Sequence, residues 1–340
     1  TWNQPSWQAV ATTLATRHLG QVVTYGGSPF PEILRGALAT NAPSHVCFVA
    51  RPEEVTEAFI AKAHQMLRQL DSDPYGDAIW GIVTGLTAAD AQALANRAGP
   101  LTVGNALMKT AGDWLNYLSS GVYHSEFDTG TVWTRANGGV INQQTDGPVD
   151  DTQALVAALN ANNVDLMVTS GHATEYDWQL HYPEASPEGY FLASNGQLYG
   201  RTFGGANYNV NTSNDKVYYA PGNCLIAHIP EDSSRVNCMA LAWLKTGGAA
   251  QMAGYVVPTS YGYMGWGVSD YFVKLQDRWT FAESCFLNNQ ALIFDDLHDT
   301  PGVNPTALTY DRDVFVLYGD PAYVARLQPV TQPDYSQTLQ

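Results

Sequence analysis

The feature that most constrains the fold is a repeated alternation between short apolar runs and amphipathic stretches. The apolar runs have the length and β-branched content of buried strands: "HVCFVA" begins at His45, "AIWGIVTG" at Ala78 and "VDLMVTS" at Val164. Between them lie stretches such as 51–70, in which apolar residues recur at about 3.6-residue spacing, as in amphipathic helices. Strands that alternate with helices pack into a mostly parallel sheet with helices on its faces. The sequence therefore predicts an α/β fold with mostly parallel sheets.

The same pattern predicts how the chain is divided. Residues 21–25 ("QVVTY") are expected to form a strand, and 105–120 ("NALMKTAGDWLNYLSS") a helix. Residues 121–149 are rich in Gly and Thr and interrupt the alternation, so we place the seam between two α/β halves there. We expect two side-by-side subdomains and a short tail, with these bounds: 1–128, 129–330 and 331–340.

Charge and hydropathy exclude two classes of partner. The 340 residues include 32 acidic and 16 basic side chains, a formal net charge of −16, and contain no basic cluster. Such a chain has little attraction for a phosphate backbone, so we expect no nucleic-acid partner. No apolar run approaches the roughly 20 residues that a transmembrane helix needs, so we expect no membrane span.

The candidate chemistry lies where two predicted strands end. His172 follows the run "VDLMVTSG", and Cys224 follows the next strand-like run, "KVYYAPGN". Side chains just beyond the carboxyl ends of parallel strands line the ligand crevice, and adjacent strands lie about 4.8 Å apart. A cysteine and a histidine so placed can act as nucleophile and general acid/base. Backbone N–H groups at Gly171, Ala173 and Cys224 would then face a developing oxyanion.

The order of these motifs resembles the gingipain-type cysteine peptidases of the caspase-like group. That family shows a Gly-His pair after one strand, a tryptophan soon after, a cysteine after the next strand, and a late Gly-Asp-Pro. The matching residues here are Gly171-His172, Trp178, Cys224 and Gly319-Asp320-Pro321. The resemblance covers roughly residues 150–325 and implies a caspase/gingipain-like fold in which 129–330 is the catalytic subdomain.

The resemblance also implies an activity and a site. It implies a cysteine endopeptidase that cleaves peptides or proteins through a thioester, with Cys224 as nucleophile, His172 as general acid/base and no cofactor. The aromatic loop "PTSYGYMGWG" would wall the specificity pocket. Candidate pocket residues are Tyr261, Tyr263, Trp266, Glu175 and Asp177. The family and the lysine-poor composition suggest a secreted or cell-envelope protein.

Departures from the family pattern keep two other functions open. Ala173 stands where the family usually has Gly, and "CLIAHIPED" lacks the Gly that the family often has shortly after the cysteine. A catalytically silent member, acting as a binding or assembly module, is therefore one alternative. The other is a zinc hydrolase that uses ligands from this region, because three ligands and an open position suffice for zinc; its candidate ligands are His172, Asp177, His181 and His228.

The interval from His172 to Cys224 is longer than the resemblance leads us to expect. The additional length comes from residues 184–215, which are rich in Gly, Asn and Tyr. We interpret them as an insertion. Long loops of this kind are often functional, so it is either a flap over the site, a structural excursion or an interaction surface.

Overall fold

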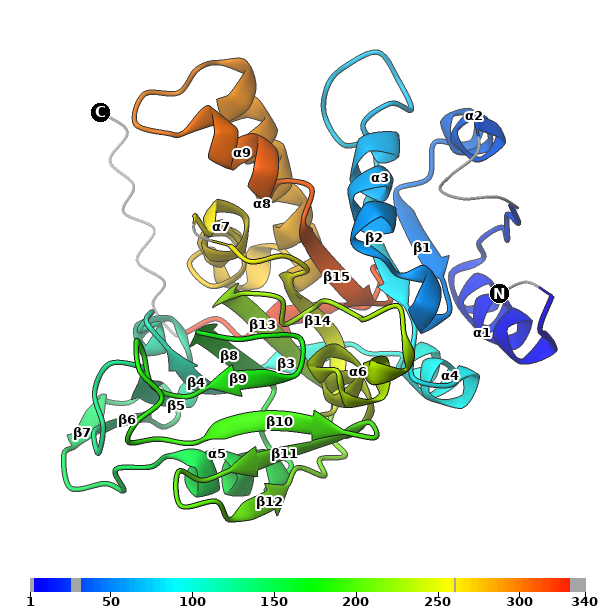
Figure 1. The fold of residues 1–340 in the computed structure, drawn as a ribbon. Helices are drawn as coiled ribbons and strands as arrows, with labels where there is room; N and C mark the ends of the chain where they lie inside the picture. The colour runs from blue at the N-terminus through cyan, green and yellow to red at the C-terminus, as the bar shows by residue number, and fades with distance from the viewer. Residues whose placement is uncertain (1–2, 26–31, 260, 331–340) are drawn as a thin grey trace.

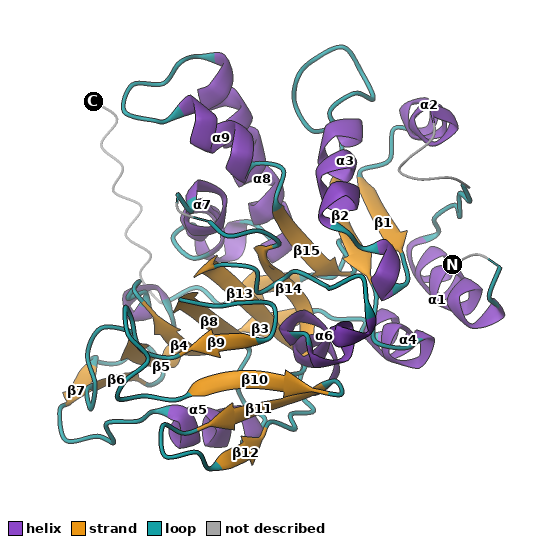
Figure 2. Cartoon of the chain, in the orientation of Figure 1, coloured by secondary structure: helices purple, strands orange, loops and turns teal. Residues whose placement is uncertain are grey.

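A mostly parallel sheet of ten strands runs through the residues that the computed structural model describes, which are 3–25, 32–259 and 261–330 (Figure 1, Figure 2). This confirms the predicted α/β class. In spatial order the strands are β1 (His45–Val49), β2 (Ile79–Val83), β15 (Phe315–Gly319), β14 (Ala249–Tyr255), β13 (Lys216–Asn223), β8 (Leu166–Gly171), β4 (Asn105–Thr110), β5 (Ser120–Ser125), β6 (Val132–Arg135) and β7 (Asn142–Gln144).

Strand direction divides the sheet into two parallel blocks. In one block β1, β2 and β15 run parallel, and in the other β14, β13, β8, β4 and β5 do so. The blocks meet where β14 pairs antiparallel with β15. The carboxyl ends of β8 and β13 therefore lie at one edge of the sheet, and the carboxyl end of β15 lies at the opposite edge.

Helices cover both faces of the sheet, because successive side chains of a strand point to opposite faces. In β13, Tyr218 stacks on Trp243 of α6 with ring centroids 4.0 Å apart, while the hydroxyl of Tyr219 donates to the carbonyl of Gly265 in α7. Figure 1 accordingly shows α7 and α8 above the sheet and α5 and α6 below it. The α-helices are α1 (Pro5–His18), α2 (Glu32–Asn41), α3 (Glu57–Leu67), α4 (Ala88–Asn96), α5 (Thr152–Asn160), α6 (Met239–Lys245), α7 (Tyr263–Phe272), α8 (Phe281–Leu297) and α9 (Pro305–Asp311).

The predicted insertion 184–215 folds into strands. Together with β9 it forms an antiparallel sheet that packs on α5 and α6, in the lower part of Figure 1. Asn195 and Gly196 link two of its strands with φ angles of 49° and 74°, as a type I′ hairpin turn requires. The sheet contains β9 (Asp177–Gln179), β10 (Tyr190–Ser194), β11 (Gln197–Arg201) and β12 (Asn207–Asn209), and a separate two-stranded sheet pairs β3 (Leu101–Val103) with β16 (Ala325–Leu327).

Three local predictions were wrong. Residues 105–120 are not helical, because they supply all of β4 and begin β5, with a 3-10 turn at Leu115–Tyr117 between them. Their apolar residues face two covered sides of a sheet, and this imitates helical spacing. Residues 21–25 form no strand. The aromatic loop is partly helical, since α7 begins at Tyr263.

The proposed division at 128 and 129 remains a prediction. Strands from 1–128 lie at both ends of the large sheet, with β1 and β2 beside β15, and β4 and β5 beside β8. The proposed tail, 331–340, lies outside the described residues. No helix within the described residues is both long and apolar enough to cross a membrane.

Candidate active site

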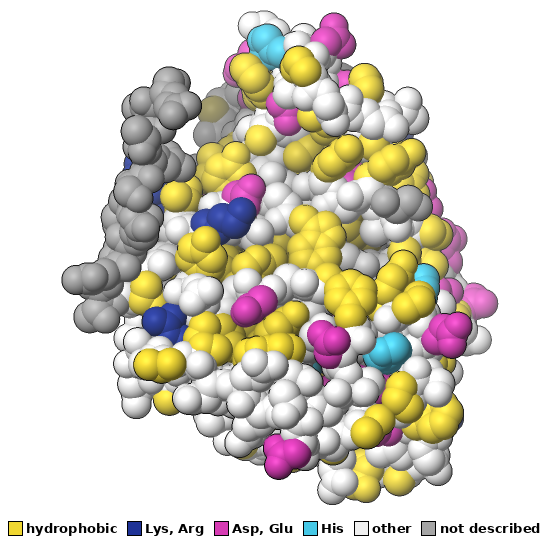
Figure 3. Space-filling view, turned by 90° about the vertical axis from the view of Figure 1, so that its left-hand side faces the viewer, with side chains coloured by type: hydrophobic (Ala, Val, Ile, Leu, Met, Phe, Trp, Pro, Cys, Tyr) yellow, Lys and Arg dark blue, Asp and Glu magenta, His cyan; other side chains and the backbone are white. Residues whose placement is uncertain are grey.

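The two predicted catalytic residues follow paired positions on neighbouring strands. The parallel register of β8 and β13 makes Gly171 and Asn223 Cα partners. His172 and Cys224 are the next residues, so the backbone positions that carry them leave the same edge of the sheet side by side. Figure 3 shows the side of the molecule toward which these strands point. Hydrophobic side chains gather across the middle of this face, with acidic side chains scattered among them.

The side chains of His172 and Cys224 make different contacts. The exposed ring of His172 lies against Tyr182, with centroids 4.8 Å apart. The half-buried thiol of Cys224 donates to the carbonyl of Thr259 and accepts from its N–H, both at 3.3 Å. The backbone N–H of Tyr182 donates to the backbone carbonyl of Glu126, beyond β5, at 2.8 Å, whereas Thr259 follows β14. Among the described residues, no hydrogen bond joins the imidazole to the thiol.

The turn after β8 is held by Trp178, the tryptophan of the family pattern. Its indole is fully buried, and Nε1 donates to the carbonyl of Ser170 at 2.8 Å. The backbone N–H of Gln179 donates to the carbonyl of His172 at 2.9 Å, and Ala173 forms an isolated bridge with Trp178. The chain therefore folds back on itself directly after His172 and carries this residue on a fixed hairpin.

Glu126 is a buried carboxyl group beside the histidine turn that the sequence analysis missed. It follows β5 and accepts a hydrogen bond from the hydroxyl of Ser170, two residues before His172. Burial raises the pKa of Glu126, and the Ser170 hydrogen bond and the Lys109 charge only partly oppose this. The sequence signal for Glu126 is an acidic residue directly after a strand. That strand, β5, falls in the predicted seam 121–149, so the signal is not visible without the structure.

The three aromatic residues proposed to line the pocket make different contacts. Trp266 lies over the end of β13, since a Cβ added to Gly222 would meet its ring at 2.8 Å. Tyr261 and Tyr263 stack on each other, with ring centroids 6.2 Å apart. Trp266 therefore contacts the strand that leads to the cysteine.

The two acidic candidates are engaged in the turn around β9. The carboxylate of Asp177 accepts from the hydroxyl of Thr174, and the carbonyl of Glu175 accepts from the N–H of Met239 at the start of α6. Neither carboxylate forms a hydrogen bond with His172 or Cys224 in the described part of the chain.

The Gly-Asp-Pro motif lies away from this edge. Gly319 ends β15, which runs antiparallel to β14, so Asp320 is found at the opposite edge of the sheet. There the Asp320 carboxylate contacts His18 at 2.6 Å, and its carbonyl accepts from the amide of Gln251. Asp320 of the motif thus links β14 to α1 at that edge.

The structure does not gather the zinc ligands considered above. His181 donates from Nδ1 to the carbonyl of Glu184, and Asp177 is engaged by Thr174. Within the described residues, the side chains with metal-ligand spacing are three acids of the loop after α3, outside the candidate site: Asp71, Asp73 and Asp77.

Comparisons with known proteins agree with this architecture. No protein-family model matches the sequence, and no curated protein does so. Among solved structures, the chain is similar to the Arg-specific cysteine proteinase gingipain R, with a TM-score of 0.55 and 11% identity, over 87% of this chain and 68% of that one. Another similar structure, described as a protease, has a TM-score of 0.49 and 9% identity, over 93% of this chain and 76% of that one. The likeness to gingipain R shows a caspase/gingipain-like fold.

Proposed function

We propose that the protein is a cysteine endopeptidase in which Cys224 is the nucleophile and His172 the general acid/base. The observation that carries the proposal is the register of β8 and β13, which pairs the residue before His172 with the residue before Cys224. The likeness of the fold to a cysteine proteinase supports it. A nucleophile and a base on adjacent strand ends are the elements that acyl transfer needs.

The reaction follows from these two groups. His172 takes the proton of the Cys224 thiol, and the resulting thiolate attacks the carbonyl carbon of the scissile peptide bond. Backbone N–H groups at Gly171, Ala173 and Cys224 face the oxyanion that forms. The C–N bond then breaks, and the imidazolium of His172 protonates the leaving amine. Water then attacks the thioester while His172 takes its proton, the C–S bond breaks to release the acid product, and the imidazolium returns the proton to the Cys224 thiolate. For the attack, the His172 ring and the Cys224 thiol must come within hydrogen-bond distance of each other. The exposure of His172 leaves its ring room to move.

Alkylation and substitution test the proposal together. The native protein is treated with iodoacetamide, the labelled residue is identified by mass spectrometry, and hydrolysis of a mixed peptide library is measured. We expect label on Cys224 and loss of hydrolysis in proportion to labelling. Cys224→Ala and His172→Ala should each lower kcat/KM by about 1000-fold or more.

Cys47→Ala is the matched control, because burial raises the pKa of the Cys47 thiol and makes it a poor nucleophile. This variant should keep its hydrolytic activity. Full hydrolysis by Cys224→Ala would contradict the proposed function.

A specific observation favours a second candidate, a catalytically silent binding or assembly module. The ring of His172 and the thiol of Cys224 contact different neighbours, and Leu225, directly after the cysteine, has a left-handed φ of 55°, which a residue with a side chain rarely adopts. If this candidate is correct, the peptide library stays intact and His172→Ala leaves the alkylation rate of Cys224 unchanged.

A further inference from the structure

Asn223 is a buried amide directly before Cys224, and its side chain crosses to the neighbouring strand. The residue has no exposed surface. Its Nδ2 donates to the carbonyl of Gly171 at 3.0 Å, and its Oδ1 accepts from the hydroxyl of Thr169 at 2.5 Å. Because a carbonyl oxygen only accepts, the contact with Gly171 fixes which end of the amide faces it.

This amide is part of a longer buried network. The Thr169 hydroxyl lies 3.0 Å from the hydroxyl of Tyr218, whose ring stacks on Trp243 of α6. Each polar atom of the Asn223 side chain thus has a partner, and the network continues into the packed helix layer. A satisfied buried network of this kind holds one conformation, since an alternative would leave polar groups unpaired in the core.

The backbone pairing of the two strands is irregular directly before the site. Tyr219 pairs with Val168, but Gly222 pairs with Ser170, so β13 contains one more residue than β8 over this interval. The extra residue is a bulge that includes Pro221, which has no N–H to donate. The Asn223 amide adds hydrogen bonds between the two strands directly after this interruption of the backbone ladder.

We infer that Asn223 is a positioning residue for the Cys224–His172 pair, an inference that rests on the proposed function. The carbonyl of Gly171 and the N–H of His172 belong to one planar peptide. A hydrogen bond that fixes this carbonyl therefore fixes the direction of that N–H and the Cα of His172. The donor is the residue next to Cys224, so one side chain sets the histidine backbone relative to the cysteine backbone.

The first test measures how Cys224 reacts as pH changes. Iodoacetamide alkylation of Cys224 is followed by mass spectrometry from pH 5 to 9 in the wild type, His172→Ala and Asn223→Ala. We expect His172 to raise the reactivity of the wild type near neutral pH, and Asn223→Ala to lose this increase and match the profile of His172→Ala. We also expect Asn223→Ala to lower kcat by about 10- to 100-fold, with KM changed by less than about twofold, because misplacement by about 1 Å costs about 100-fold in rate.

Two further variants and a control separate positioning from stability. Thr169→Ser keeps the hydroxyl and should keep the wild-type profile, whereas Thr169→Val removes it and should shift the profile toward that of Asn223→Ala. Gln251→Glu is the control. Gln251 is another fully buried amide that donates to a carbonyl, but it lies near the start of β14, at the edge of the sheet away from Cys224. This variant should lower the melting temperature without changing the profile. If Asn223→Ala does not fold, Asn223→Asp keeps the shape of the side chain and tests loss of the Nδ2 donor.

The outcomes distinguish the two proposals. If the wild-type profile depends on His172 and the Asn223 and Thr169→Val variants leave it unchanged, the positioning inference is wrong and the dyad stands. If the wild-type profile does not depend on His172, both proposals are wrong. If the Asn223 and Thr169→Val variants shift the profile but the wild type hydrolyses no peptide, positioning is supported and the peptidase activity is not.

Discussion

At the scale of single residues, Gly171 has a backbone conformation that a side chain would strain. Its φ is +90°, and a Cβ at this position would lie 3.2 Å from Oε2 of the buried Glu126. L-residues rarely adopt such a φ, and a carboxylate at that distance would have to move. The backbone geometry therefore requires the glycine before His172.

We predict that Gly171→Ala lowers the free energy of unfolding by roughly 1–3 kcal/mol, which is the usual cost of a strained backbone position. Urea denaturation followed by circular dichroism measures the change. Gly36→Ala is the matched control, since Gly36 lies within α2 and a Cβ there meets nothing within 4 Å. The control should gain about 0.5–1 kcal/mol, as Gly-to-Ala changes in helices do. An equal gain in both variants would contradict the strain argument.

At the scale of elements, a buried charge cluster attaches the β9–β12 sheet to the large sheet. Lys109 of β4 lies 2.9 Å from Asp151, at the start of α5, and 2.8 Å from Glu188, in the loop before β10. His124 of β5 lies 3.0 Å from Asp151. One lysine thus faces two carboxyl groups that are almost fully buried.

The pKa values of the two carboxyl groups shift in opposite directions. Burial raises the pKa of Asp151, but hydrogen bonds and charges from His124 and Lys109 outweigh this and hold it below its ordinary value. Burial raises the pKa of Glu188 to about 7, and Lys109 opposes this only in part. Glu188 thus keeps its proton in the folded state at pH values where the unfolded chain has lost it.

We predict that this cluster makes the protein less stable as pH rises from about 4.5 to about 7. The contribution of Glu188 is fully present below its unfolded pKa and is lost as pH passes through its folded pKa, with a size on the order of 2–3 kcal/mol. Glu188→Gln cannot titrate, so its unfolding free energy, measured in urea at several pH values, should lack this fall. Glu184→Gln, an exposed acid of the same loop, should keep the wild-type dependence. If Glu188→Gln and the wild type have parallel curves, the cluster does not control the pH dependence.

The same elements show what could be predicted from sequence. The strands before His172 and Cys224 were predictable, because fully buried parallel strands are continuous apolar runs. The placement of Lys109 was not, because the residues around it have helix-like spacing and its partners come from positions 151 and 188. The hairpin at Asn195-Gly196 carried a usable turn signal that the interpretation as an insertion overlooked. Asn223 has a role only through the register of two strands, and local sequence does not specify register.

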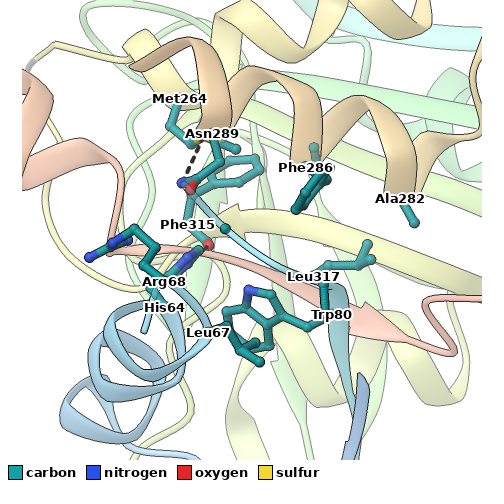
Figure 4. Close-up of a pocket in the computed structure, with 13 residues that line it drawn as sticks. His64, Leu67, Arg68, Trp80, Met264, Ala282, Phe286, Asn289, Phe315 and Leu317 are labelled. Carbon is teal, nitrogen blue, oxygen red and sulfur yellow. Dashed lines mark hydrogen bonds between the residues drawn. The ribbon is translucent and has the colours of Figure 1, made fainter. Parts of the chain in front are cut away.

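At the scale of the whole molecule, the N-terminal and C-terminal parts of the chain join around His64 (Figure 4). This residue of α3 is buried, and its Nε2 donates to the carbonyl of Phe315 in β15 at 3.0 Å. Its ring lies edge-on to Trp80 of β2, with centroids 4.7 Å apart. The neighbouring Arg68 binds Asp313 through two hydrogen bonds, at 2.6 and 2.9 Å. A small cavity of about 40 Å³ lies at this junction between α3, β2, α8 and β15.

The junction gives the whole molecule a sensitivity to acid. Burial lowers the pKa of His64 to about 4, and the nearby Asp313 carboxylate and the Phe315 carbonyl offset this only partly. The stability that depends on neutral His64 is present above the unfolded pKa of about 6.5 and is lost as pH falls toward 4, because the unfolded chain binds the proton first. This dependence is opposite in sign to that of Glu188, so the two contributions largely cancel between about pH 4.5 and 6.5, and the variant of each residue reveals the contribution of the other.

We predict that His64→Gln reduces the acid-induced loss of unfolding free energy between pH 6.5 and pH 4 by on the order of 2–3 kcal/mol. A glutamine amide can still donate to the Phe315 carbonyl but has no proton to gain. The measurement is urea denaturation at half-unit pH steps, read by tryptophan fluorescence and by circular dichroism. His298→Gln is the matched control, because His298 also donates from its ring to a backbone carbonyl, that of Phe294, but is exposed. If both variants follow the wild-type curve, acid sensitivity has its origin elsewhere in the molecule, and His64 joins the two parts of the chain through packing and its hydrogen bond without controlling the pH dependence.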